Sequence, residues 1–109
     1  IYGCDDCQLA CPWNKFAEPA QYADFNPRPE FDKPDWFAMM RWTEEEFLKL
    51  TEGSAIRRIG YKRFRRNLAV AAGNSIGVAG MPEALIEMRA GADAFLSEHI
   101  DWALEQLRC

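Results

Sequence analysis

The positions of the prolines divide this chain of 109 residues into two parts that are expected to fold differently. Five of the six prolines lie within residues 1–42, and only Pro82 lies beyond them. Proline lacks the backbone N–H of a helix interior and biases the preceding residue toward extended geometry, so the run Asn26-Pro27-Arg28-Pro29 is not expected to be helical. We therefore expect residues 1–42 to be irregular, apart from a short helix over about 35–40.

The same part of the chain is rich in aromatic side chains. Their apolar surface is expected to be buried, so we expect an extended segment that packs on a partner surface. The chain begins with Ile1 rather than Met, and a cysteine motif follows three residues later. We therefore expect that the chain was cut from a longer protein, which supplies much of that surface. The aromatic residues are Trp13, Phe16, Tyr22, Phe25, Phe31, Trp36 and Phe37.

The sequence changes character at residue 43. Thr43-Glu44-Glu45-Glu46 predicts a capping box, in which the Thr43 hydroxyl accepts from the Glu46 amide while Glu46 reaches back. Apolar residues at helical spacing, bounded by glycines and capping residues, then predict helices over about 44–52, 55–59, 61–74, 82–90 and 94–107. No stretch alternates with period two, so no strand is predicted.

The predicted fold class is therefore all-α. The segments 44–74 and 82–107 each resemble an antiparallel helix pair, and stacked pairs that bury each other's faces are typical of an α-solenoid. We predict a HEAT-like helical domain over residues 43–109. It follows an irregular segment over residues 1–42, rich in Cys, Pro and aromatic residues, that carries a partial ferredoxin-type [4Fe–4S] motif.

Charge is unevenly distributed along the chain. The net charge of −4 argues against a nucleic-acid partner, but residues 53–80 contain no Asp or Glu. Arginines neutralise phosphates and aromatic rings stack on unpaired bases, so the cations there, interleaved with Tyr61 and Phe64, are interpreted as an RNA-binding surface. The alternative for any single cation is a solvated helix face or an ion pair with Glu44–Glu46. The six cations lie within ten positions: Arg57, Arg58, Lys62, Arg63, Arg65 and Arg66.

Three cysteines near the start of the chain have the spacing of an iron–sulfur motif. Cys4, Cys7 and Cys11-Pro12 form C-x2-C-x3-C-P, which equals the last three cysteines of the bacterial ferredoxin run. The first cysteine of that run would fall at Ile1. Because the cysteine before proline serves the other cluster of a pair, Cys4 and Cys7 are expected to share one cluster and Cys11 to belong to a second. The remaining ligands are expected to lie outside this chain.

Other interpretations of the cysteines stay open. A structural zinc site prefers two C-x2-C knuckles or Cys/His pairs, and the only histidine, His99, is distant in sequence. A redox pair begins a helix after a strand, and no strand precedes Cys4. The crowding of three cysteines and the lack of a secretion signal argue against a disulfide framework. Cys109 is expected to be a plain thiol.

At this point the sequence resembles a known family. The C-terminal third of the epoxyqueuosine reductases is similar to this chain over nearly its whole length, including the segment His99–Leu104. The stretches that carry the resemblance are Tyr2-Gly3-Cys4-Asp5-Asp6-Cys7-Gln8-Leu9-Ala10-Cys11-Pro12-Trp13-Asn14, Gly53-Ser54-Ala55-Ile56-Arg57-Arg58 and Arg65-Arg66-Asn67-Leu68-Ala69-Val70-Ala71-Ala72-Gly73-Asn74.

The resemblance implies a tRNA-modifying oxidoreductase in queuosine biosynthesis. The family reduces the epoxide of epoxyqueuosine in the anticodon loop of tRNA, with cobalamin and two [4Fe–4S] clusters. The resemblance implies that Cys4 and Cys7 bind one cluster and that Cys11 binds the other. It also implies that the remaining ligands, the cobalamin site and the catalytic acid lie upstream. This part alone is therefore not expected to be catalytic. Expected partners are the tRNA anticodon region and the N-terminal remainder of the protein.

Two further hypotheses come from other classes. The first is a non-catalytic iron–sulfur electron carrier or protein-interaction module on a helical scaffold, and the second is a zinc-stabilised helical domain. No window approaches the roughly 18 consecutive apolar residues of a membrane span, and no signal peptide opens the chain. We expect a cytoplasmic monomer.

Overall fold

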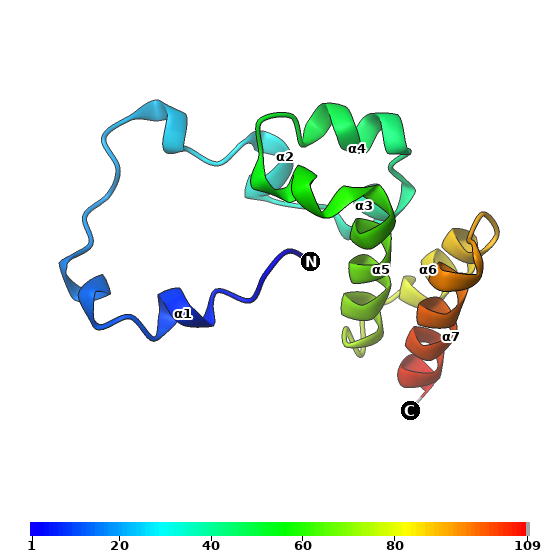
Figure 1. Ribbon diagram of the computed structural model, residues 1–109. Coiled ribbons are helices and arrows are strands. Elements are labelled where there is room, and N and C mark those ends of the chain that lie inside the picture. Colours follow the sequence, from blue (N-terminus) through cyan, green and yellow to red (C-terminus); the bar gives the residue numbers. More distant parts are fainter. Residues whose placement is uncertain (109) are drawn as a thin grey trace. The chain divides into compact units, whose positions relative to one another are not determined.

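The computed structural model describes residues 1–108 and divides them into two units (Figure 1). One unit consists of Ile1–Tyr2 and the chain from Asp35 onward, and the other is Gly3–Pro34. Within residues 1–108 all regular structure is helical and no strand occurs, so the predicted all-α class is confirmed. The expectation for Cys109 lies outside the described residues.

The unit Gly3–Pro34 is an open chain with isolated helical turns, coloured blue to cyan in Figure 1. It contains α1 (Asp6–Leu9), the 3-10 turns η1 (Pro12–Phe16) and η2 (Ala23–Phe25), and α2 (Pro29–Asp32), none of which has a buried residue. Pro29 begins α2, which differs from the expectation that the whole run 26–29 is non-helical. A helix tolerates proline in its first turn, where the missing N–H has no intrahelical partner.

Capping side chains set the starts of the first two helices in the other unit. Asp35 accepts from the Phe37 amide at 3.0 Å and begins α3 (Trp36–Arg41). The predicted capping box is present at α4 (Glu44–Leu50): the Glu46 amide donates to Thr43 Oγ1 at 3.2 Å, and the Thr43 amide donates to Glu46 Oε2 at 2.8 Å. Each cap satisfies amides that a helix start otherwise leaves unpaired.

Four further elements complete this unit. Ser54 accepts from the Ile56 amide at 3.2 Å and starts η3 (Ala55–Ile59), which leads into α5 (Gly60–Gly73). Pro82 lies in the first turn of α6 (Met81–Arg89). Asp93 accepts from the Leu96 amide at 2.9 Å and starts α7 (Ala94–Arg108). The helices expected from residue 35 onward are therefore confirmed, with ends shifted by one or two residues.

The buried core runs through α3 to α7. Helix α5 packs most extensively against α7, and α6 packs against α7 as well. The rings of Phe47 on α4 and Phe64 on α5 lie 4.8 Å apart, centroid to centroid. Burying a large apolar side chain stabilises a fold by about 1.5–3 kcal/mol, so these contacts hold the unit together. The largest fully buried apolar side chains are Phe47, Phe64, Leu68, Met81, Leu85 and Ile100.

The helices of each expected pair contact each other, but the HEAT-like arrangement remains a prediction. Helix α5 contacts α4 within the first expected pair, and α6 contacts α7 within the second. The more extensive contact of α5 with α7 joins the two pairs. No helix described here combines the length and apolar character that crossing a membrane requires.

Candidate functional site

The three clustered cysteines lie in the open unit. Cys7 is in α1, Cys4 precedes that helix and Cys11 follows it. Cys4 and Cys7 are exposed, Cys11 is half-buried, and none of the three forms a disulfide. Positive φ angles on both sides of Cys4, +68° at Gly3 and +58° at Asp5, turn the chain sharply there.

The donor set fits an iron–sulfur group in kind but not in number. Cysteine thiolates are the ligands such clusters take, and each [4Fe–4S] cluster takes four. Within residues 1–108, no three or more Cys, His, Asp or Glu side chains are gathered as a metal ion requires. A cluster bound here therefore needs thiols beyond Cys4, Cys7 and Cys11.

The six cations of the basic segment fall into two groups of three. Arg57 and Arg58 on η3 and Arg63 on α5 are exposed, and no acceptor or ion-pair partner is found for them within residues 1–108. The alternative ion pairs with Glu44–Glu46 are absent among the described residues. These three arginines, here called the free arginines, can meet a polyanion without first breaking a contact.

The other three cations are held by side chains and backbone of the fold. Arg65 Nη2 donates to the Met88 carbonyl oxygen at 3.1 Å. Arg66 donates through Nε and Nη2 to Asn67 Oδ1 at 3.1 and 2.9 Å. Lys62 Nζ lies 3.2 Å from Asp93 Oδ2. Part of the cation cluster expected to contact RNA thus also joins α5 to α6 and to the start of α7.

Phe95 is the aromatic centre of this junction. Lys62 Nζ lies 4.7 Å and Arg66 Cζ 5.9 Å from the centre of its ring, within the range of cation–π attraction. The ring of His99 lies 5.0 Å away on the next turn, and its Nδ1 is 2.8 Å from the Phe95 carbonyl oxygen. His99 therefore makes local contacts with the preceding turn of its own helix. In sequence it is distant from the three clustered cysteines.

Asp93 is the acidic partner at the start of α7. The hydrogen bond from the Leu96 amide lowers the pKa of its carboxyl group below the ordinary value, and the hydrogen bond and charge of Lys62 lower this pKa further. The carboxylate is therefore ionised at neutral pH. It offsets one positive charge of the basic segment.

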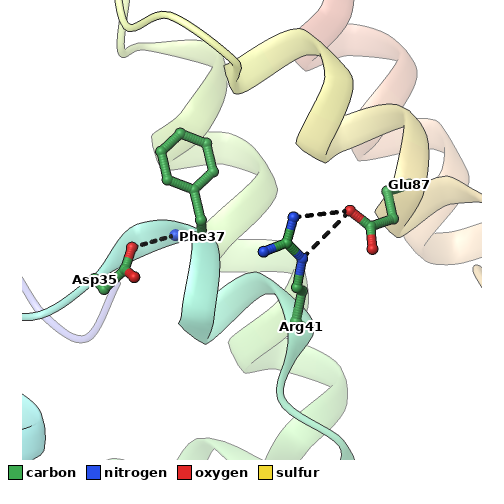
Figure 2. Close-up of polar contacts among 4 residues, drawn as sticks. All are labelled: Asp35, Phe37, Arg41 and Glu87. Atoms are coloured by element: carbon green, nitrogen blue, oxygen red, sulfur yellow. Dashed lines mark hydrogen bonds and ion pairs between the residues drawn. The ribbon is translucent and has the colours of Figure 1, made fainter.

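A cavity of about 310 Å³, here called the α3–α6 cavity, opens between α3, α5 and α6. Arg41 on α3 reaches across to Glu87 on α6, with Nη2 3.3 Å from Oε2, as Figure 2 shows. Trp42, Tyr61 and Arg65 also line it. No sequence pattern predicts this cavity, because Arg41 and Glu87 are 46 positions apart and neither belongs to a motif.

Arg65 is the most constrained charged group in the α3–α6 cavity. Its Cζ lies 5.6 Å from the centre of the Tyr61 ring, and its Nη2 is bonded to Met88. Its Nε is buried and has no acceptor within residues 1–108. Tyr61 is itself fixed, because its hydroxyl donates to the Trp42 carbonyl oxygen at 2.6 Å.

Comparison with known proteins identifies relatives. No protein-family model and no solved structure matches this chain. Over 97% of its length it is 52% identical to the epoxyqueuosine reductase of Salmonella typhimurium and 51% identical to that of Escherichia coli. Over 99% of its length it is 53% identical to that of Shewanella oneidensis. The chain spans only 27–28% of these relatives, and the resemblance expected from the sequence is confirmed.

Proposed function

We propose that this chain, a relative of the epoxyqueuosine reductases over nearly its whole length, forms part of such an enzyme. The whole protein reduces the epoxide of epoxyqueuosine in a tRNA anticodon loop, giving queuosine. In this proposal the chain has two tasks: it supplies cysteine ligands to two [4Fe–4S] clusters, and it presents a helical surface to tRNA. Cobalamin and the catalytic acid belong to other parts of the protein, which acts in the cytoplasm.

The observation that carries the RNA-binding task is the set of free arginines. Arg57, Arg58 and Arg63 are exposed without an acidic partner among the described residues, in a stretch that contains no Asp or Glu from residue 53 to 80. Clustered like charges repel each other in the free protein, and a polyanion relieves that repulsion. Phosphate contacts of this kind give affinity that falls steeply with salt.

Filter binding of tRNA at several salt concentrations tests this task. The Arg58→Gln/Arg63→Gln double variant is expected to weaken binding and to lower the log–log salt slope by roughly 0.7–0.9 for each lost phosphate contact. The matched control, Lys49→Gln/Arg108→Gln, removes the same charge from exposed positions outside the segment. Equal losses in both variants would mean that only net charge matters, and the proposed surface would then be wrong.

The cluster task rests on the cysteine spacing and on the free thiols of all three cysteines, of which Cys4 and Cys7 are exposed. Cys4 and Cys7 are proposed to bind one cluster and Cys11 the other, together with cysteines from the rest of the longer protein. The clusters supply electrons for the reduction. The three thiolates are proposed to hold iron.

Iron and sulfide analysis of a full-length epoxyqueuosine reductase carrying this stretch tests the ligand assignment. Cys4→Ala and Cys11→Ala are each expected to lose about half of the iron, and the double variant nearly all of it, since each residue serves a different four-iron cluster. Cys109→Ser is the control and is expected to retain full iron. Stoichiometric zinc without a broad visible charge-transfer band would replace the cluster proposal with the zinc alternative.

A specific observation also supports a protein-interaction role for the open unit. Leu9, Trp13, Phe16, Tyr22 and Phe25 are all exposed large apolar residues. Such side chains mark a surface that another protein surface covers. We propose that the remainder of the longer protein is this partner, as part of the same enzyme rather than of a separate electron carrier.

A further inference from the structure

We propose that Asn67 and Arg66 of α5 position the chain that leads into the cysteine motif. The inference rests on the proposed cluster task and extends it, because it assigns the residues that hold one end of the ligand-bearing segment. Neither residue is an iron ligand. Both act through the backbone of Ile1, three residues before Cys4.

The side-chain amide of Asn67 has a partner at both of its ends. Its Nδ2 donates to the Ile1 carbonyl oxygen at 2.7 Å. Its Oδ1 accepts from Arg66 Nε at 3.1 Å and from Arg66 Nη2 at 2.9 Å. A guanidinium has only donors and a carbonyl oxygen only accepts, so the amide satisfies both partners in this one orientation. Asn67 therefore links Arg66 to the backbone ahead of the cysteines.

Arg66 is held in the position that this link requires. It is half-buried, and its Cζ lies 5.9 Å from the centre of the Phe95 ring on α7. Arg63, three positions earlier on the same helix, is exposed and has no partner within residues 1–108. The structure therefore distinguishes a cation that orients Asn67 from one that is free to meet RNA.

The anchored residue stands directly before the segment that carries the cysteines. Ile1 and Tyr2 belong to the helical unit and are 38% and 44% exposed, so more than half of each is covered. Three residues of extended chain span at most about 10–11 Å, and the φ of +68° at Gly3 bends the chain within that span. The hydrogen bond at Ile1 therefore restrains Cys4 through the covalent chain.

Such a restraint favours binding of the cluster. A ligand that is already restrained loses less conformational freedom when it binds iron than a ligand on a free chain. Residues beyond the ligands orient them, and loss of such residues typically weakens metal binding by about 10–100-fold. Cys4 lies three positions from Ile1 and Cys11 lies ten, so the cluster of Cys4 is the one expected to depend on Asn67.

Iron release to a chelator from a full-length epoxyqueuosine reductase carrying this stretch tests the positioning role. Asn67→Asp keeps an acceptor for Arg66 but places a carboxylate oxygen, which cannot donate, against the Ile1 carbonyl oxygen. About half of the iron is expected to leave about tenfold faster than from the unaltered protein. Asn67→Gln, which retains both the donor and the acceptor, is expected to bring the rate part of the way back.

Matched controls are available on the same helix. Asn74 Nδ2 donates to the Val70 carbonyl oxygen at 2.8 Å, so Asn74→Asp removes the same kind of bond and adds the same charge at the C-cap of α5. It is expected to release iron at the unaltered rate. Arg66→Lys, which retains the charge but lacks the paired donors, is expected to speed the release, whereas Arg63→Lys is not. Thermal unfolding by circular dichroism checks that each variant folds.

Variants that keep a single cluster show which cluster responds. In the proposed ligand assignment, Cys11→Ala keeps the cluster of Cys4, and Cys4→Ala keeps the cluster of Cys11. Asn67→Asp is expected to speed iron release about tenfold in the first background and to leave it unchanged in the second. The electron paramagnetic resonance spectrum of the reduced cluster is expected to change in the first background alone, which a general loss of stability would not produce.

The outcomes separate this inference from the proposed function on which it rests. If folded Asn67→Asp and Arg66→Lys release iron as slowly as the unaltered protein, the positioning role is wrong while cluster binding stands. The same conclusion follows if Asn74→Asp releases iron as fast as Asn67→Asp, or if both single-cluster backgrounds respond equally. If the unaltered full-length protein holds no iron–sulfur cluster, both the positioning role and the cluster task are wrong. If Asn67→Asp does not fold, the comparison of Arg66→Lys with Arg63→Lys decides.

Discussion

At the scale of single residues, Asp93 shows how one side chain serves both local and tertiary structure. One carboxylate oxygen caps α7 through the Leu96 amide, and the other lies 3.2 Å from Lys62 Nζ. The cap is a short-range signal that the sequence contains. The ion pair depends on α5 and α7 meeting, because Lys62 is 31 positions away.

The charge of Asp93 makes a pH-dependent contribution to stability. Because its folded pKa lies below the ordinary value of 3.8, the contribution is present above that value and is lost as the pH falls through the folded pKa. Asp93→Asn keeps a capping side chain but has no charge. The melting temperature of the variant is therefore expected to lie below that of the unaltered protein at neutral pH and to converge with it in strong acid.

Thermal unfolding followed by circular dichroism between neutral pH and pH below 3.8 measures this effect. The difference at neutral pH is also expected to shrink at high salt, because both partners are exposed and salt screens their attraction. If the difference in melting temperature stays constant across pH, the asparagine side chain caps α7 less well than the aspartate does and the charge has no effect.

At the scale of elements, α5 and α7 cross closely because Gly73 at the crossing has no side chain. A Cβ on Gly73 would lie 2.8 Å from the Ala103 Cα and 2.8 Å from Trp102 Cζ3. Both contacts are closer than real Cβ atoms adopt. Gly73 is the last residue of α5, and the structure places it, buried, at the crossing point with α7.

Gly73→Ala is therefore expected to destabilise the protein by about 1–3 kcal/mol, the usual effect of adding a methyl group to a tightly packed contact. Gly91→Ala is the matched control, because a Cβ there meets nothing within 4 Å. Urea denaturation of both variants measures the free energy of unfolding. Similar values for the two would mean that α7 shifts readily and that the crossing is not tight.

At the scale of the whole molecule, the buried apolar core lies entirely between Met39 and Ala103. The unit Gly3–Pro34 contributes none of these residues. The stability of the helical unit is therefore expected to come from the chain after residue 34, because apolar burial is the main favourable term in folding.

A chain that begins at residue 35 is accordingly expected to fold and to melt cooperatively within a few degrees of the full chain. The shortened chain loses the hydrogen bond from Asn67 Nδ2 to the Ile1 carbonyl oxygen, 2.7 Å long. Such a bond contributes about 0.5–1.5 kcal/mol. Loss of cooperative unfolding in the shortened chain would show that residues 1–34 are needed for the core.

The sequence by itself determined the helices of residues 35–108 and the position of the basic segment. Capping residues such as Thr43 and Ser54, apolar spacing along α5 and the proline distribution all act over a few residues, so they can be recognised without the fold. Only the tertiary structure decided which cations are free. Arg65 is bonded to Met88, 23 positions away, whereas Arg63 on the same helix has no partner among the described residues. The α3–α6 cavity likewise exists only where α3, α5 and α6 meet, because contacts over such sequence distances depend on how helices pack rather than on any local pattern.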